Sequence, residues 1–181
     1  PPIRATATLQ AVSVTEVEPG AFIFDMGQNF AGWPRLRVQG PRGTTVTMRM
    51  GELLNPDGTL NGMTAVAGQI KGTRRDGTPR GGPGAPDIAY QADSYTLRGE
   101  GLEVYTPRFT FHGFRYVEVT GFPGTPTLDA IEGLRLNTEA DPVGTFACSN
   151  ELLNRVQKMT QWTLLSNLFS VQSDCPSREK F

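Results

Sequence analysis

The sequence is poor in the residues that build metal sites, basic surfaces and membrane spans. Among 181 residues there are two cysteines and one histidine, and 17 Lys and Arg balance 18 Asp and Glu to a net charge of −1. Two Cys and one His cannot complete a zinc site without help from carboxylates. No apolar run approaches the roughly 20 residues that span a bilayer, and no basic excess favours nucleic acid. We therefore expect no metal, no cofactor, no nucleic-acid partner and no membrane association.

The two cysteines, Cys148 and Cys175, are too few for a disulfide framework. A single bridge between them would require an oxidising compartment, and the interpretation we favour is two reduced thiols, one of them buried. The first residues, PPIRATATLQ, lack the charged region and the apolar region of a signal peptide. The sequence does not indicate a compartment.

Glycine and proline are plentiful, with 21 and 14 residues, which is typical of a fold with many turns. In TTVTMRMGE (44–52), Val46, Met48 and Met50 alternate with polar residues, as in a half-buried strand. Further short strands are predicted in AFIFDMG, PRLRVQG, DSYTLRG, RFTFHGF, RYVEVTG and AIEGLRLNTE. Strands separated by turns, without a helical period between them, predict a mainly β fold: an antiparallel β-sandwich or jelly roll. The Gly-, Pro- and Arg-rich stretch at 71–87 is expected to be a long mobile insertion.

The hydrophobic period changes after Cys148 from two residues to between three and four. The segment SNELLNRVQKMTQWTLLSNLFS predicts one amphipathic helix, with Ser149 or Asn150 as its N-cap. Its apolar stripe comprises Leu152, Leu153, Val156, Met159, Trp162 or Thr163, Leu165, Leu168 and Phe169. Because one striped helix cannot bury itself alone, we expect a sandwich domain at 1–142 and the start of a truncated helical domain at 143–181.

Candidates for chemistry gather in the last residues, SDCPSREKF. Asp174 and Glu179 supply carboxylates, and Arg178 lies beside them. Glycoside hydrolysis uses two carboxyl groups across the scissile bond, but acids in a Pro-containing loop are more often solvated or ion-paired. His112, the only histidine, is expected to be packed or hydrogen-bonded because no nucleophile motif accompanies it. NPDGTLNG (55–62) lacks the sixth-position Gly and twelfth-position Glu of an EF-hand and is expected to be a turn.

Three motifs occur in one order along the chain: GQNFAGW (27–33), FTFHGFRY (109–116) and DCPSRE (174–179). With the sequence around them, they resemble bacterial α-L-rhamnosidases of glycoside hydrolase family 78, and the resemblance covers nearly all of the chain outside the 71–87 insertion. It implies a concanavalin-like sandwich followed by the first helix and acid-bearing loop of an α/α six-hairpin catalytic domain.

The same resemblance implies roles for individual residues. The family removes terminal α-L-rhamnosyl units with inversion, so Glu179 is similar to its general acid, Asp174 to a carboxylate that holds sugar hydroxyls, and Arg178 to a residue that orients the acid or contacts substrate. The general base lies far downstream in the family. We therefore expect this chain to be a fragment that is inactive alone, with a rhamnose-containing glycoside or polysaccharide as the substrate of the full-length enzyme.

A different class of function is also compatible with the sequence: a non-catalytic carbohydrate-binding or scaffolding sandwich. Phe30, Trp33, Tyr90 and Tyr95 could stack on sugar rings, although core packing is favoured for Phe30 and Trp33. The stripe on residues 152–169 further predicts that the chain self-associates or folds its helix back onto the sandwich.

Overall fold

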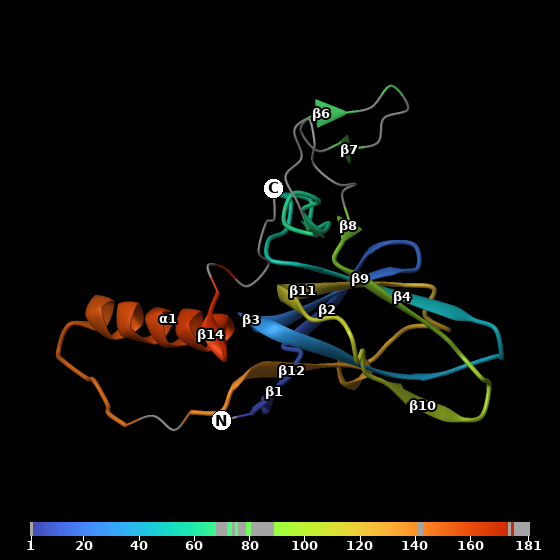
Figure 1. Ribbon diagram of the computed structural model, residues 1–181. Helices are drawn as coiled ribbons and strands as arrows, with labels where there is room; N and C mark the ends of the chain where they lie inside the picture. The colour runs from blue at the N-terminus through green and yellow to red at the C-terminus, as the bar shows by residue number, and fades with distance from the viewer. Residues whose placement is uncertain are drawn as a thin grey trace.

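The computed structural model describes residues 2–67, 72–73, 75, 79–80, 89–140, 143–173 and 175. These residues form a mainly β body with one helix beside it (Figure 1). The principal strands are β1 (Ile3–Gln10), β2 (Ser13–Glu18), β3 (Ala21–Gln39), β4 (Thr45–Gly51), β9 (Ala92–Thr96), β10 (Leu102–Tyr105), β11 (His112–Thr120) and β12 (Ile131–Thr138). The expectation of an antiparallel β fold followed by one helix is confirmed.

All eight strands belong to one antiparallel sheet that curls over on itself, and the 19-residue strand β3 connects its two halves. The first part of β3 pairs with β2 and with the end of β11, and its last part pairs with β12 and β10. Between these parts Gly27 has a φ of +74°, and the register with β11 shifts between Phe114 and Tyr116. Such bulges bend strands, so one sheet supplies both layers of the sandwich.

The core lies between the two layers and is built from alternating residues of the central strands. Val46, Met48 and Met50 are fully buried on one face of β4, as their alternation predicted. Other fully buried side chains come from β3 and from its neighbours β11 and β12: Phe24, Phe30, Leu36, Phe114, Val117, Val119 and Ile131. Phe30 is therefore a core residue, as expected.

The structure also changes several of the predicted strands. AFIFDMG and PRLRVQG, predicted as separate strands, are the two ends of β3. RFTFHGF and RYVEVTG are likewise joined in β11, which begins only at His112. The strands β1, β2 and β10 were not predicted, because their side chains are largely exposed and lack a strong apolar alternation.

Little of the predicted insertion at 71–87 lies within the described residues. Its described part contains β6 (Gly72–Thr73) paired with β7 (Pro79–Arg80). Nearby, β5 (Val66–Ala67) pairs with β8 (Ala89–Tyr90). The expected turn at 55–62 is confirmed by backbone hydrogen bonds from Gly58 to Asn55 and from Asn55 to Thr59.

The helix α1 (Glu151–Asn167) begins at Asn150, whose side chain accepts hydrogen bonds from the N–H groups of Leu152 and Leu153. Asn150, one of the two expected caps, thus satisfies two of the free N–H groups of the first turn. After β12 the chain runs away from the sheet, and α1 returns toward it (Figure 1). The helix ends before Leu168 and Phe169, which belong to the strand β13 (Leu168–Phe169) rather than to the helical stripe.

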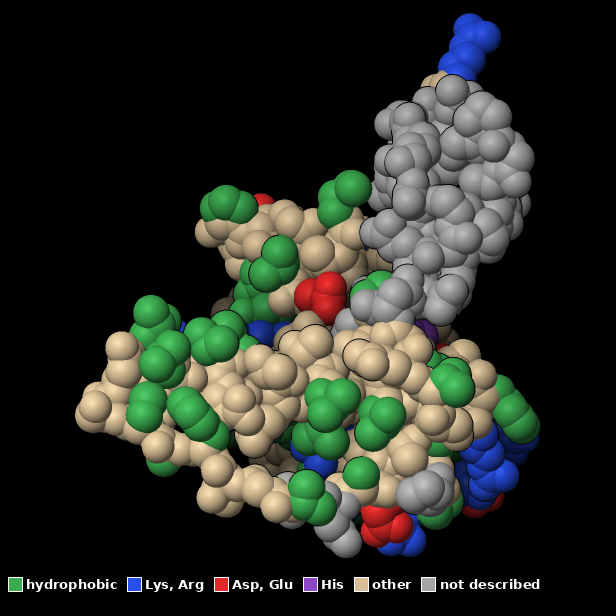
Figure 2. All heavy atoms as spheres, turned by 60° about the vertical axis from the view of Figure 1, so that its left-hand side comes forward, with side chains coloured by type: hydrophobic (Ala, Val, Ile, Leu, Met, Phe, Trp, Pro, Cys, Tyr) green, Lys and Arg blue, Asp and Glu red, His purple; other side chains and the backbone are tan. Residues whose placement is uncertain are grey.

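Much of the predicted stripe faces outward. Leu152, Leu153, Val156 and Met159 are exposed, whereas Trp162 packs against the core. Figure 2 shows hydrophobic side chains spread over the face where the helix comes forward. The helix therefore packs against the core of the sandwich through Trp162, near its carboxyl end. No helix in the described part of the chain is long and apolar enough to cross a membrane.

Candidate functional site

The three residues predicted to form the site, Asp174, Arg178 and Glu179, lie outside the described residues. The structure does describe the chain that leads to them, through α1, the hairpin of β13 and β14 (Val171–Gln172), and Ser173. Cys175 lies within the predicted motif and is partly exposed, and Cys148 is exposed. Both thiols are free, but neither is buried, so the expectation of one buried thiol is wrong.

Asn167 holds the end of the helix and the start of the acid-bearing segment together. Its side-chain amide donates to the carbonyl of Thr163 at 2.7 Å, within the last turn of α1. Its own carbonyl accepts from the backbone N–H of Ser173 at 2.8 Å, and its side-chain oxygen lies 3.2 Å from the Ser173 hydroxyl. Asn167 is only 4% exposed, so these bonds are shielded from water. Ser173, directly before Asp174, is thereby tied to the helix.

The hairpin between Asn167 and Ser173 also contacts the sandwich at two points. The backbone N–H of Ser170 donates to the hydroxyl of Thr138, at the end of β12, over 2.6 Å. The ring of Phe169 stacks on Phe111, with centroids 4.7 Å apart and an interplanar angle of 29°. These contacts connect the segment that precedes Asp174 with two separate parts of the β domain.

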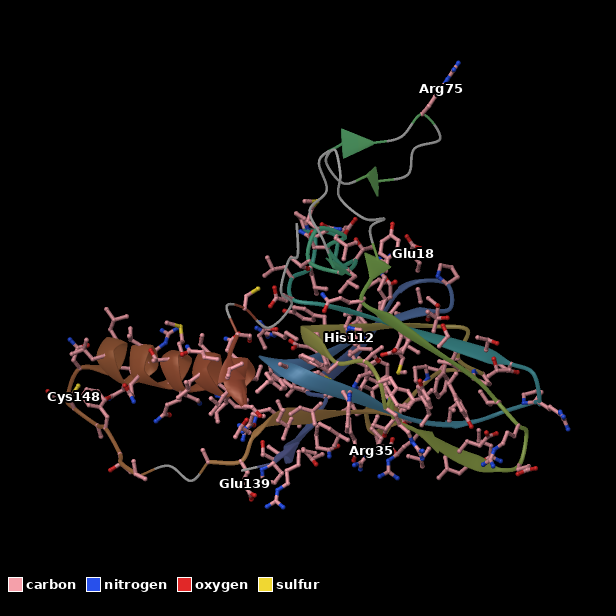
Figure 3. The ribbon with its side chains drawn as sticks, viewed as in Figure 1. Glu18, Arg35, Arg75, His112, Glu139 and Cys148 are labelled. Carbon is pink, nitrogen blue, oxygen red and sulfur yellow. The ribbon has the colours of Figure 1, made fainter. Side chains whose placement is uncertain are left out.

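The residues on either side of Phe111, Thr110 and His112, both bond to the carboxylate of Asp93. His112 Nε2 is 2.9 Å from one carboxylate oxygen of Asp93, and the Thr110 hydroxyl donates to the other at 2.9 Å. Burial alone would raise the pKa of Asp93, but the hydrogen bonds from His112 and Thr110 outweigh burial and hold that pKa below its usual range. Figure 3 places His112 within the sheet, where β11 begins. His112 is thus hydrogen-bonded, as expected, and fixes the end of the loop that carries Phe111.

A third contact packs the helix against the sandwich. The guanidinium of Arg135, on β12, lies 5.2 Å from the ring centroid of Trp162, within the range of a cation–π interaction. Hydrogen bonds orient Arg135 toward the Thr6 hydroxyl and the side-chain oxygen of Asn137, each at 3.2 Å. Burial lowers the pKa of Arg135, although an arginine stays charged at neutral pH.

Where α1 approaches β3 and β4, the structure leaves a cleft of about 670 Å³. The cleft is lined by Gln28, Asn29, Glu52, Glu151, Arg155, Lys158, Met159, Trp162, Thr163 and Ser166. The amide of Asn29 donates to Glu52 at 2.8 Å, which links the GQNFAGW motif to the end of β4. The side-chain oxygen of Asn29 is buried and has no hydrogen-bond partner among the described residues. The cleft lies at the junction of helix and sandwich.

The candidate sugar-stacking aromatics have different surroundings. The indole N–H of Trp33 donates to the carbonyl of Thr110. Tyr95 stacks on Tyr105 and donates its hydroxyl to Glu103 at 2.7 Å. Tyr90 is 49% exposed. Phe30 is fully buried and cannot stack on a sugar ring. In the described contacts, Trp33, Tyr90 and Tyr95 do not form one shared surface for stacking.

Sequence reasoning missed four residues that the structure brings together at this site: Phe111, Thr138, Asn167 and Ser173. The FTFHGFRY motif contains Phe111, but no local pattern indicates that its ring meets Phe169. A polar Asn–Ser pair flanking a short hairpin is a signal that could have identified Asn167 and Ser173, since such side chains often bond nearby backbone. Within the described residues no group of three or more His, Cys, Asp or Glu side chains is placed to hold a metal ion.

The curled antiparallel sheet followed by one helix defines a class of fold, a mainly β body joined to a helical segment. Two family models match in that order. The bacterial alpha-L-rhamnosidase concanavalin-like domain matches residues 15–137, and the bacterial alpha-L-rhamnosidase 6 hairpin glycosidase domain matches residues 141–181. The chain belongs to the bacterial α-L-rhamnosidase family.

Individual relatives agree with this assignment. An alpha-L-rhamnosidase of Streptomyces avermitilis is 42% identical over 179 residues, which cover 99% of this chain and 15% of that protein. A crystal structure of the Streptomyces avermitilis enzyme with L-rhamnose has a TM-score of 0.82 over 98% of this chain and 15% of that one. An alpha-L-rhamnosidase structure from Dictyoglumus thermophilum has 40% identity and a TM-score of 0.81, covering 99% and 18%. The chain thus spans less than a fifth of the length of these relatives.

Proposed function

We propose that this chain is part of an inverting α-L-rhamnosidase that hydrolyses terminal non-reducing α-L-rhamnose residues of glycosides or polysaccharides. The observation that carries the proposal is the order of the two family matches, with the sandwich first and the six-hairpin glycosidase domain beginning at residue 141. The same order supports a division into a sandwich domain at 1–142 and the first helix and acid-bearing loop of the catalytic domain at 143–181.

In this proposal Glu179 is the general acid that protonates the glycosidic oxygen. Asp174 holds hydroxyl groups of the rhamnosyl unit, and Arg178 orients the acid or contacts the sugar. Inversion requires a second carboxylate, roughly 6.5–9.5 Å from the acid, that activates water on the opposite face of the ring. The DCPSRE motif at 174–179 supports the first three roles. The base belongs to the part of the relatives that this chain does not span, so we expect the 181-residue chain to be inactive alone.

We also propose that the isolated chain self-associates through the outer face of α1. The side chains of Leu152, Leu153, Val156, Met159 and Leu164 are between 43% and 66% exposed there. An apolar face of this kind is normally covered by a partner. In the isolated chain, a second copy is the available partner.

The experiment that tests the hydrolytic function measures the hydrolysis of an aryl α-L-rhamnoside by the full-length enzyme, its Glu179→Gln variant and the 181-residue chain. We expect activity in the full-length enzyme, a loss of about 10²–10⁴-fold in Glu179→Gln, because the acid proton is removed, and no activity in the chain alone. Glu100→Gln is the matched control, since Glu100 has a side chain that is 70% exposed and lies far along the sequence from the motif.

Equal activity in the full-length enzyme and in Glu179→Gln would contradict the assigned acid. A full-length enzyme without rhamnosidase activity would contradict the function itself. A non-catalytic sandwich that binds carbohydrate would then be the alternative to test, by its affinity for L-rhamnose.

A further inference from the structure

We propose that Phe111 and Thr138, both on the β domain, are positioning residues for the general acid of the helical domain. This inference rests on the proposed function, in which Glu179 is the general acid. It adds a role for the sandwich: the β domain sets where the acid-bearing segment starts, through one ring stack and one hydrogen bond.

The β-domain side of this contact is held firmly in place. Thr138 is 7% exposed and pairs with Ile3 of β1 at the end of the β1–β12 ladder. Phe111 directly precedes His112, which is bonded to Asp93 within the body of the sheet. Thr138 is therefore part of the sheet, and Phe111 is attached directly to the first residue of β11.

The hairpin side is equally constrained. Phe169 pairs with Val171, and the single residue between them, Ser170, has a φ of +64°. It is the only non-glycine residue of the described chain with a positive φ. A residue in this sparsely populated conformation persists only where its surroundings hold it, and here the bond to Thr138 and the stack on Phe111 flank it. The bonds between Asn167 and Ser173 then close the hairpin onto the helix end.

This geometry matters for catalysis because Asp174 follows Ser173 directly and Glu179 lies five residues further on. The hairpin and Ser173 directly precede this segment, so the contacts with Phe111 and Thr138 set where the chain enters the DCPSRE motif. A general acid must lie within hydrogen-bond reach of the leaving oxygen, and a misplacement of about 1 Å costs roughly 10²-fold in rate. Phe111 lies outside the buried core cluster and is 48% exposed, so its ring can stack on Phe169 without being part of the sandwich core.

The test uses the full-length enzyme and two substrates that differ in their need for an acid. Phenyl α-L-rhamnoside has a poor leaving group that must be protonated, whereas 2,4-dinitrophenyl α-L-rhamnoside has a leaving group that departs largely without help. For Phe111→Ala and Thr138→Val we expect kcat on the phenyl substrate to fall by about 10- to 10²-fold, with less than a threefold change on the dinitrophenyl substrate. KM should change little on either.

Thr138→Ser keeps the hydroxyl that accepts the Ser170 N–H, so it should restore activity on the phenyl substrate. Phe109→Ala is the matched control, because Phe109 lies on the same loop and is 99% exposed; it should behave as the unmodified enzyme. If Thr138→Val does not fold, as judged by circular dichroism, Phe111→Ala alone decides the matter.

An equal loss on both substrates, or no loss in the folded variants, would overturn the positioning role while the unmodified enzyme still hydrolyses both. An unmodified enzyme that hydrolyses neither substrate would instead overturn the proposed function, and this inference with it.

Discussion

Gly32, in the GQNFAGW motif, lies where β3 is enclosed by β11 and β12. It pairs with His112 on one side and with Arg135 on the other. A Cβ built at this position would be 2.0 Å from the carbonyl oxygen of Leu134, and backbone in the middle of a sheet cannot move aside. The glycine is therefore required by the close approach of two strands.

We expect Gly32→Ala to lower the free energy of unfolding by about 1–3 kcal/mol or more, as overpacking usually does. Gly62→Ala is the control, because an added Cβ there meets nothing within 4 Å, and its effect should stay within about 0.5 kcal/mol. Urea denaturation of the two variants and of the unmodified chain measures both. Equal stability of the two variants would mean that the strands separate more easily than the structure indicates.

Glu103, on β10, is a buried acid that the sequence did not distinguish from its neighbours. Its carboxylate accepts from the Tyr95 hydroxyl at 2.7 Å and from the backbone N–H groups of Arg98 and Gly99 at 3.0 and 2.9 Å. The hydrogen bond from Tyr95 leads these contacts in lowering the pKa of Glu103 to about 2.

This lowered pKa predicts a pH dependence of stability. Between the unfolded value of about 4.5 and the folded value of about 2, the unfolded chain binds a proton that the folded chain does not, so stability falls as the pH falls through this window. Glu103→Gln cannot titrate, and we expect its unfolding free energy to vary less between pH 5 and pH 2. Denaturation curves at several pH values measure the difference. Parallel pH profiles for the two proteins would contradict the assigned bonds.

At the scale of elements, local sequence signals predict the amino-terminal end of α1 well. The helix begins at one of the two expected caps, Asn150, because its side-chain oxygen reaches two free N–H groups. Its other end was not predictable from periodicity. The stripe continues through Leu168 and Phe169, but these residues leave the helix because their partners, Gln172, Val171 and Phe111, lie outside it.

We expect Asn150→Ala to destabilise the first turn of α1 by about 1 kcal/mol, since the cap bonds to Leu152 and Leu153 are lost. Because this turn lies away from the sandwich, hydrogen exchange of the amides of residues 152–156 is the appropriate measurement. Ser149→Ala is the control and should leave the exchange rates unchanged. Faster exchange in Ser149→Ala than in Asn150→Ala would show that the cap had been assigned to the wrong residue.

The sheet illustrates the opposite case, in which tertiary contacts override the local signals. AFIFDMG ends at Gly27, and the six residues between it and PRLRVQG include Gly32, so a break between two strands was a reasonable prediction. The chain continues as one strand because β11 and β12 pair with that stretch at His112, Gly113 and Arg135.

At the scale of the whole molecule, the exposed face of α1 predicts how the isolated chain behaves. We expect the sedimentation coefficient of the 181-residue chain to rise with concentration, because burying the apolar side chains of two copies is favourable. Analytical ultracentrifugation over a concentration series measures this. A double variant, Leu152→Gln with Met159→Gln, is the control and should sediment as a monomer. A concentration-independent monomer in the unmodified chain would contradict the prediction.

Short-range patterns were sufficient for the antiparallel β class, the alternating faces of β4, one helix and the two candidates for its cap, Ser149 and Asn150. Each of these depends on residues a few positions apart, whose spacing follows from the geometry of the strand or helix itself. The motifs from 27 to 179, taken in order, were sufficient for the family. The curling of one sheet into two layers, the closeness of Gly32 to Leu134, and the meeting of Phe111 and Thr138 with the hairpin before Asp174 were not predictable in the same way. These three features join residues that are far apart along the chain. Which distant residues meet depends on the packing of the whole fold rather than on any local preference.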